Sequence, residues 1–202
     1  MGAVLAGGMS RRMGVPKATL RLPDGRSMLE AAVAALLPIC DRVAMVGGNP
    51  EWLADLSLQI EYFPDIHPGE GPLAGIEAAL ASCCRTDVSP AVLGGCLIVG
   101  CDQPCLRTEL LGRLIEGNPD HPRVFGETGI MHPLPGFYPA AWLPQVVLAM
   151  VNGTRSVQTS LASAGVEILR LGRNDLWFLR SFNTPEQFSS LSDPRELRSA
   201  ST

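Results

Sequence analysis

The chain has 202 residues and a formal net charge of −4, with 46% hydrophobic and 18% charged residues. This composition is typical of a folded globular protein and argues against a nucleic-acid partner, which would require a basic face. No apolar run approaches the length of about 20 residues that a membrane span needs, and the basic pair Arg11–Arg12 follows the first apolar run, whereas a signal peptide has its basic residues in front. We expect a cytoplasmic protein without a membrane partner, in which residues 1–191 form one domain and residues 192–202 a polar tail.

Apolar runs alternate with stretches of helical pattern along the chain. The predicted elements are, in order, a strand at 3–6, a helix at 28–37, strands at 43–46 and 59–63, a helix at 73–83, a strand at 96–100, helices at 108–116, 140–151 and 156–163, and a strand at 166–171. Runs such as "LIVG" do not alternate between apolar and polar residues, which is typical of strands covered on both faces. We therefore predict a three-layer α/β fold with a mostly parallel sheet, whose ligands collect beyond the carboxyl ends of the strands.

The cysteines are spaced in a way that does not favour a metal site. They are Cys40, Cys83, Cys84, Cys96, Cys101 and Cys105. Cys101 and Cys105 have no second matching pair, and Cys83 is adjacent to Cys84, so the two-pair spacing of a zinc site is missing. We expect buried or unreactive thiols.

The first predicted strand runs into the loop "GGMSRRMGVPK". Gly7 and Gly8 allow backbone amides to approach an anion closely. Ser10 adds a hydroxyl donor, Arg12 a planar fork and Lys17, the only lysine of the chain, a compact charge suited to phosphate oxygens. The spacing fits neither the P-loop nor the dinucleotide fingerprint. A glycine-rich turn with solvated arginines is the structural alternative.

The whole run "LAGGMSRRMGVPK" resembles the signature of the molybdenum cofactor guanylyltransferases, a family of MobA-like nucleotidyltransferases. The matching positions are Leu5, Ala6, Gly7, Gly8, Ser10, Arg12, Met13, Gly14 and Lys17. The resemblance implies a Rossmann-like sheet and a loop, from Leu5 onward, that binds the phosphates of GTP. It also implies that Lys17 and Arg12 are catalytic.

A second stretch, "GPLAGI", resembles the loop that holds the guanine base in this family. Its glycines let backbone groups approach a flat ring, and its proline suits the first turn of a helix. Asp65, upstream of it, can accept a hydrogen bond from a base N–H. The resemblance implies nucleotide contacts at Gly71, Pro72, Leu73, Ala74 and Gly75. A helix start with a packing glycine is the alternative.

The stretch "GCDQP" places Asp102 just after a predicted buried strand, where a carboxylate can hold Mg²⁺ against nucleotide phosphates. Cys101, Asp102 and Pro104 match the Cys-Asp-x-Pro pattern of the family. The resemblance therefore implies that Asp102 is the metal ligand and a catalytic residue. An aspartate that only caps a turn or a helix is the alternative.

Near the C-terminus, "FNTPEQF" resembles the Asn-Thr-Pro-Glu run of the family. We expect Thr184 or Asn183 to cap a helix that begins at Pro185. The resemblance implies that Asn183 also faces the pterin substrate or the metal. Ser181 departs from a second asparagine that the family often has at that position.

The stretch "HPLPGFYP" resembles a family segment that precedes a long helix, so His132, and the later Arg155, are candidate contacts of the pterin. A turn role for His132 is the alternative. The reaction implied is transfer of GMP from GTP to the phosphate of molybdopterin, or of Mo-molybdopterin, with Mg²⁺ as cofactor and release of pyrophosphate. Other molybdenum cofactor proteins or molybdoenzyme chaperones are further candidate partners.

Two other functions are compatible with the sequence. The first is a guanylyl- or cytidylyltransferase that acts on another phosphorylated acceptor, such as a sugar phosphate or phospholactate; Ser181 favours it. The second is a protein that binds GTP or the cofactor without catalysing transfer. The presence of both Lys17 and Asp102 argues against this second function, because mere binding does not require a metal aspartate.

Overall fold

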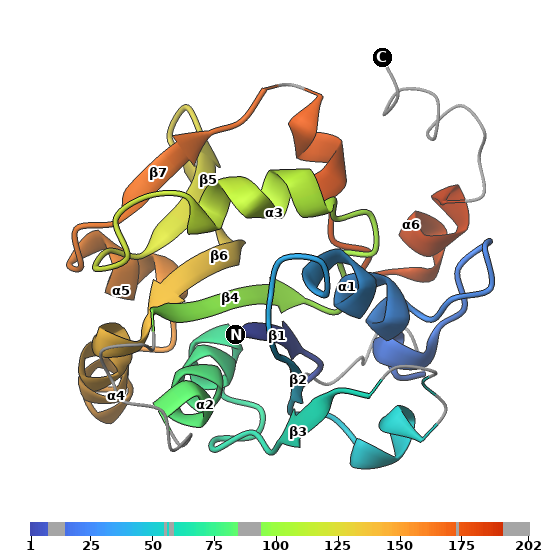
Figure 1. Ribbon diagram of the computed structural model, residues 1–202, viewed down its shortest axis with the longest axis horizontal. Coiled ribbons are helices and arrows are strands. Elements are labelled where there is room, and N and C mark those ends of the chain that lie inside the picture. Colours follow the sequence, from blue (N-terminus) through green and yellow to red (C-terminus); the bar gives the residue numbers. More distant parts are fainter. Residues whose placement is uncertain (8–14, 55, 57–58, 85–93, 173, 192–202) are drawn as a thin grey trace.

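The computed structural model describes residues 1–7, 15–54, 56, 59–84, 94–172 and 174–191 (Figure 1). The strands are β1 (Gly2–Leu5), β2 (Val43–Val46), β3 (Glu61–Phe63), β4 (Gly95–Gly100), β5 (Arg123–Glu127), β6 (Ile130–Pro139) and β7 (Glu167–Arg170). The α-helices are α1 (Met28–Leu36), α2 (Pro72–Cys84), α3 (Thr108–Ile115), α4 (Leu143–Val151), α5 (Val157–Ala162) and α6 (Pro185–Ser190). Short 3₁₀ helices are η1 (Lys17–Thr19), η2 (Pro50–Leu53), η3 (Ala140–Trp142) and η4 (Asp175–Leu179). The predicted tail, 192–202, lies outside the described residues.

The strands form one sheet in the order β3-β2-β1-β4-β6-β5-β7. The pairs β1–β2, β2–β3, β1–β4 and β5–β7 are parallel, whereas β6 is antiparallel to both of its neighbours. The prediction of a mostly parallel sheet is therefore confirmed. The five strands predicted from the sequence correspond to β1, β2, β3, β4 and β7.

Helices cover both faces of the sheet, so the predicted three layers are present (Figure 1). Alternate residues of the central strands point to opposite faces. Val4 and Leu97 pack in one core beneath α1 and α3, while Ala3 and Ile98 pack in a second core beneath α2 and α4. The central strands are buried on both sides, which is why their apolar residues do not alternate with polar ones.

Local hydrogen bonds define where two of the helices begin. Ser27 Oγ accepts from the Glu30 N–H at 3.1 Å, and Glu30 Oε2 accepts from the Ser27 N–H at 2.6 Å, which forms a capping box at the start of α1. At α6, Thr184 Oγ1 accepts from the Gln187 N–H at 3.3 Å, and the helix begins at Pro185 as predicted. Within the described ranges, no helix is both long and apolar enough to cross a bilayer.

The sequence prediction lacked strands β5 and β6. Their pairing shifts register: Val124 lies opposite Gly136 and Phe125 opposite His132, so residues 133–135 of β6 bulge out of the ladder. Two of these three residues are prolines, which cannot donate a ladder hydrogen bond and are tolerated at such a bulge. The prolines also interrupt the alternation of residues by which a strand is recognised in a sequence. The sequence therefore predicts only a segment that precedes a helix.

A pair of leucine variants tests the two-sided burial of the sheet. Leu97 is 1% exposed on β4, whereas Leu148 is 60% exposed on α4. We expect Leu97→Ala to lower the free energy of unfolding by about 2–5 kcal/mol, because it leaves a cavity in a core that cannot fully collapse. Leu148→Ala should change it by less than about 0.5 kcal/mol. Urea denaturation measures both, and equal effects would contradict the assigned layers.

Candidate active site

A cavity of about 400 Å³ lies at the carboxyl ends of β1, β2 and β4. Its lining residues are Leu5, Ala6, Gly7, Lys17, Val46, Asp65, Gly69, Gly71, Pro72, Gly75, Gly100, Cys101, Asp102 and Leu134. Three of the segments that the sequence marked for chemistry therefore line the same cavity: the loop after β1, the segment before α2 and the turn after β4. This is the position that the topology of a parallel sheet favours for a ligand.

The residues predicted to bind the nucleotide or the metal, apart from the pterin contacts, fall into three groups. Those that line the cavity are Leu5, Ala6, Gly7, Lys17, Asp65, Gly71, Pro72, Gly75 and Asp102. Leu73 and Ala74 do not line it, because both are fully buried in the core beneath α2. Gly8, Ser10 and Arg12 lie outside the described residues.

Some lining residues were not predicted. Val46 and Gly100 are the last residues of predicted strands, so their position alone could have indicated them. Gly69 belongs to the segment before α2, which the sequence had already marked. Leu134 lies in the bulge of β6, and no pattern in the sequence signals its place in the cavity.

The Asp102 carboxylate is largely buried in the turn after β4. A Cβ atom at Gly100 would lie 2.6 Å from Asp102 Oδ1, so any other residue there would require the carboxylate to shift from this position. Burial raises the pKa of Asp102 above its usual value, while the charge of Lys17 and a hydrogen bond with the Ser181 side chain act in the opposite direction. A nearby cation thus offsets part of the cost of keeping this buried carboxylate ionised.

Lys17 supplies such a cation. Its Nζ atom lies 3.8 Å from Asp102 Oδ2 and donates a hydrogen bond to Asn183 Oδ1. Asn183 comes close because the Phe182 N–H donates to the Asp102 carbonyl oxygen at 2.9 Å, and Phe182 is buried in a small apolar cluster with Met28. The fourth predicted segment, near the C-terminus, therefore joins the site through Lys17.

The buried Gln103 side chain connects three parts of the site. Its Oε1 atom accepts from the Gly100 N–H at 3.2 Å, and its Nε2 atom donates to the carbonyl oxygens of Leu134 at 3.1 Å and Leu179 at 2.9 Å. These contacts join the turn after β4 to the bulge of β6 and to the segment that leads to Ser181. The sequence analysis missed this residue because it is the variable position of the Cys-Asp-x-Pro pattern.

The segment before α2 is tied down at several points. Asp65 Oδ1 accepts from the His67 N–H at 3.0 Å, and His67 Nε2 lies 3.6 Å from Glu77 Oε2 on α2. Gly71 has a φ of +90°, a backbone conformation that residues other than glycine rarely adopt. Helix α2 begins at the next residue, Pro72. The backbone between Asp65 and Gly75 is therefore held along one wall of the cavity.

None of the three predicted pterin contacts lines this cavity: Asn183 contacts it through Lys17, and Arg155 and His132 lie elsewhere. Arg155 Nε lies 2.7 Å from Glu70 Oε2, and its Nη1 atom donates to the Met150 carbonyl oxygen at 2.7 Å, so Arg155 links the segment before α2 to the end of α4. His132 lies on β6, with Nε2 3.7 Å from Glu127 Oε1 on β5. Both side chains face acidic residues of the chain itself.

The described cysteines are all free thiols. Burial raises the pKa of Cys101 to about 12, so this thiol beside Asp102 is protonated near neutral pH and is no nucleophile. Cys83 and Cys96 are also buried, whereas Cys84 is exposed. Among the described residues, no group of three His, Cys, Asp or Glu side chains could hold a metal ion.

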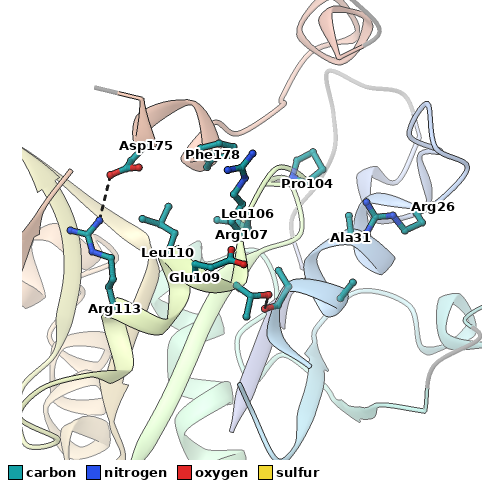
Figure 2. A pocket seen from close by; sticks show the side chains of 13 residues that line it. Arg26, Ala31, Pro104, Leu106, Arg107, Glu109, Leu110, Arg113, Asp175 and Phe178 are labelled. Carbon is teal, nitrogen blue, oxygen red and sulfur yellow. Dashed lines mark hydrogen bonds and ion pairs between the residues drawn. The ribbon is translucent and has the colours of Figure 1, made fainter. Parts of the chain in front are cut away.

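A second cavity, of about 590 Å³, lies between α1, α3 and η4 (Figure 2). The Arg107 guanidinium carbon lies 4.0 Å from the centroid of the Phe178 ring, and Arg113 Nη1 lies 3.4 Å from Asp175 Oδ2. Figure 2 marks the pair of Arg113 and Asp175 with a dashed line. Although it is larger, this cavity is lined by none of the residues predicted to bind nucleotide or metal. The smaller cavity is the better candidate for the active site.

Comparison with known proteins identifies the family. The sequence profile of the MobA-like NTP transferase domain matches residues 2–168. The chain belongs to the MobA-like NTP transferase family. Its relatives include two proteins named probable molybdenum cofactor guanylyltransferase. One, from Deinococcus radiodurans, is 34% identical over 200 residues, covering 94% of this chain and 92% of the relative. The other, from Flavobacterium johnsoniae, is 30% identical over 190 residues, covering 93% and 94%.

Solved structures of low sequence identity share the fold of this MobA-like transferase. Molybdopterin-guanine dinucleotide biosynthesis protein A from Archaeoglobus fulgidus has a TM-score of 0.74 at 24% identity, covering 94% of this chain and 95% of its own. The 2-C-methyl-D-erythritol 4-phosphate cytidylyltransferase of Thermus thermophilus has a TM-score of 0.64 at 16% identity, and the match covers 93% of this chain and 94% of that enzyme. A Mycobacterium tuberculosis protein in complex with manganese has a TM-score of 0.59 at 19% identity, and the match covers 84% of this chain and 86% of that protein.

The predictions of a Rossmann-like nucleotidyltransferase fold and of an enzyme are thereby confirmed: the protein is a nucleotidyltransferase. Its cavity can bind phosphates through a glycine-containing loop and an ammonium group, and it presents a carboxylate beside that ammonium. Because Cys101 is protonated, the site lacks an ionised thiol at this position for covalent catalysis.

A glutamine pair tests the connecting role of Gln103. Gln103 is 3% exposed, whereas Gln158 is exposed and makes one hydrogen bond, at 3.3 Å, to the Met131 carbonyl oxygen. We expect Gln103→Leu to lower the free energy of unfolding by about 2–4 kcal/mol, because it leaves buried backbone groups without their partner. Gln158→Leu should cost less than about 0.5 kcal/mol. Urea unfolding of both variants provides the comparison, and a neutral Gln103→Leu would refute this role.

Proposed function

We propose that this enzyme transfers GMP from GTP to the terminal phosphate of molybdopterin, with or without bound molybdenum, and releases pyrophosphate. The observation that carries the proposal is the convergence of three distant motifs: Lys17 and Asp102 line one cavity, and Asn183 accepts a hydrogen bond from the Lys17 ammonium. The names of the relatives support the substrates, since proteins at about a third identity over most of the chain carry the name molybdenum cofactor guanylyltransferase.

The chemistry requires positioning more than proton transfer. A phosphate oxygen of the acceptor forms a bond to the α-phosphorus of GTP, and the bond to the β-phosphate oxygen breaks, with pyrophosphate leaving with the electron pair. The attacking phosphate is already an anion, so no general base is needed. Lys17 holds the phosphates and offsets the charge that develops on the leaving group, and Arg12 is proposed to assist it.

The residues present fit a divalent cation. Asp102 offers a carboxylate oxygen and Asn183 an amide oxygen, which are hard donors of the kind that Mg²⁺ prefers, and both already face the ammonium of Lys17. Two such donors would leave positions for nucleotide phosphates and water, as is usual for Mg²⁺ at nucleotide sites. Asp102 and Asn183 would hold the ion, which would supply positive charge to stabilise the charge that develops in the transition state. The manganese complex of a structural relative is consistent with this choice.

The segment from Asp65 to Gly75 is proposed to hold the guanine base. Asp65 and Gly71 line the cavity, and the contacts of His67 and Arg155 fix the segment from two sides. A pre-positioned backbone can donate and accept at the edge of a flat base with little loss of entropy on binding. On this assignment Arg155 supports the nucleotide side, and Asn183 is the proposed residue nearest the pterin.

One observation favours a second candidate, a nucleotidyltransferase that uses CTP or another phosphorylated acceptor. Ser181 stands where the family often has an asparagine, and its side chain is hydrogen-bonded to Asp102. Because the Ser181 hydroxyl is engaged by Asp102, it is not available to bind the phosphorylated acceptor substrate. The fold itself also accommodates a cytidylyltransferase, as the Thermus thermophilus enzyme shows.

Pyrophosphate release tests the proposed reaction and its residues. With GTP, Mg²⁺ and molybdopterin, we expect Lys17→Ala and Asp102→Asn each to reduce the rate by about 100- to 1000-fold, the usual cost of removing a charge-stabilising group. Arg21→Ala is the matched control, because Arg21 is an exposed cation paired with Glu30 at 3.1 Å. A Lys17→Ala enzyme with the rate of the control would eliminate the assigned role.

Nucleotide competition separates the two candidates. We expect a preference for GTP over CTP of more than about 100-fold in kcat/KM, since a site built to hydrogen-bond one base leaves its polar groups unpaired with the other. Initial rates with molybdopterin, and then with a sugar phosphate or phospholactate, measure both nucleotide and acceptor choice. Faster release with CTP, or with an acceptor other than molybdopterin, would favour the second candidate.

A further inference from the structure

The ammonium of Lys17 lies between two oxygen atoms from different segments. Nζ donates to Asn183 Oδ1 and lies 3.8 Å from Asp102 Oδ2. Lys17 and Asp102 are each largely shielded, with side chains 19% and 26% exposed. The cluster therefore provides a partly desolvated position for one positive charge.

These two oxygens are the donors that fit a divalent cation, so the lysine and the metal compete for them. Both oxygens lie close to one ammonium position, so a positive charge there, whether ammonium or metal, is attracted by them. Both cations cannot occupy the same few ångströms without strong repulsion, because charge interactions are poorly screened in such a site. Binding of one must displace the other from the two oxygens.

The chain suits such an exchange because the cation is a lysine. An arginine would hold the carboxylate through a planar, two-pronged contact, whereas an ammonium on a flexible four-carbon stem can change partners easily. Lys17 begins the short helix η1, next to the cavity that its side chain lines. It is also the only lysine in a chain with 16 basic residues.

We propose that Lys17 occupies the cation position between Asp102 and Asn183 in the nucleotide-free enzyme and moves onto the nucleotide phosphates when a divalent cation enters. Metal and nucleotide then bind cooperatively, because the metal releases the lysine and the phosphates accept it. The inference rests on the nucleotide and metal binding of the proposed function, and it is independent of the acceptor.

The exchange predicts that loss of Lys17 strengthens metal binding when no nucleotide is present. Removing a cation beside a metal ligand relieves competition, so we expect Lys17→Met to bind Mn²⁺ alone about tenfold more tightly than the wild type. Lys17→Arg should bind it no more tightly than the wild type. A non-cleavable α,β-methylene analogue of GTP should strengthen Mn²⁺ binding in the wild type and do so much less in Lys17→Met.

The experiment titrates Mn²⁺ into the full-length protein and follows the free ion by electron paramagnetic resonance, with and without the analogue. Arg21→Met controls for the loss of one positive charge outside the cluster, and circular dichroism confirms that each variant is folded. Asp102→Asn should remove the gain when combined with Lys17→Met, which shows that the ion binds at this carboxylate.

The result is decisive in either direction. Tighter Mn²⁺ binding by Lys17→Met than by Arg21→Met, lost with Asp102→Asn, supports the exchange. Unchanged, weaker or unmeasurable Mn²⁺ binding by Lys17→Met, or a gain that persists in Asp102→Asn, overturns it. Because no acceptor is present, an enzyme that passes this test but releases no pyrophosphate with molybdopterin would contradict the proposed function alone.

Discussion

The geometry of the candidate site depends on the side-chain amide of Gln103. It is buried, and it bonds at once to the turn after β4, the bulge of β6 and the segment that follows η4. Hydrogen bonds in a buried, low-dielectric setting are strong, and leaving them unmade is costly. The positions of Asp102, Leu134 and Asn183 are therefore not independent: each lies within a few residues of a group that this amide holds.

Electrostatics at the site is local and not a property of the whole molecule. The chain carries a net charge of −4, yet its cavity is suited to a ligand with several negative charges. Within the cavity, Lys17 compensates the charge of the Asp102 carboxylate, so that the pair together is close to neutral. In the exchange proposed above, a divalent cation would replace this ammonium and add positive potential, and the ammonium would stay near the phosphates.

Much of the fold and the site could be predicted because both follow short-range rules. Alternating apolar and helical stretches indicated five of the strands, and the carboxyl ends of parallel strands meet at one edge, so the motifs after β1 and β4 were expected to converge. The prediction failed where the chain reverses direction. The bulge of β6 breaks the two-residue period of the strand, so the position of Leu134 in the cavity could not be predicted.

Ion pairs and hydrogen bonds between distant segments could not be inferred from spacing. The sequence predicts Arg155 and His132 as pterin contacts, and only the structure shows their ion pairs with Glu70 and Glu127. Leu73 and Ala74 matched a nucleotide-binding motif but face the core, because a helix presents only one side to a cavity.

The sequence by itself determined the layers, the sheet type and which loops line the candidate cavity, since these depend on local pattern and on the positions of glycine, lysine and aspartate after the strands. Only the tertiary structure decided that Asn183, 166 residues from Lys17, bonds to its ammonium, and that Gln103 joins the surrounding segments. The physical reason is that a hydrogen bond depends on distance and direction to within a few tenths of an ångström. That accuracy arises when packing of the whole chain, including the burial of Phe182 against Met28, fixes where each segment ends.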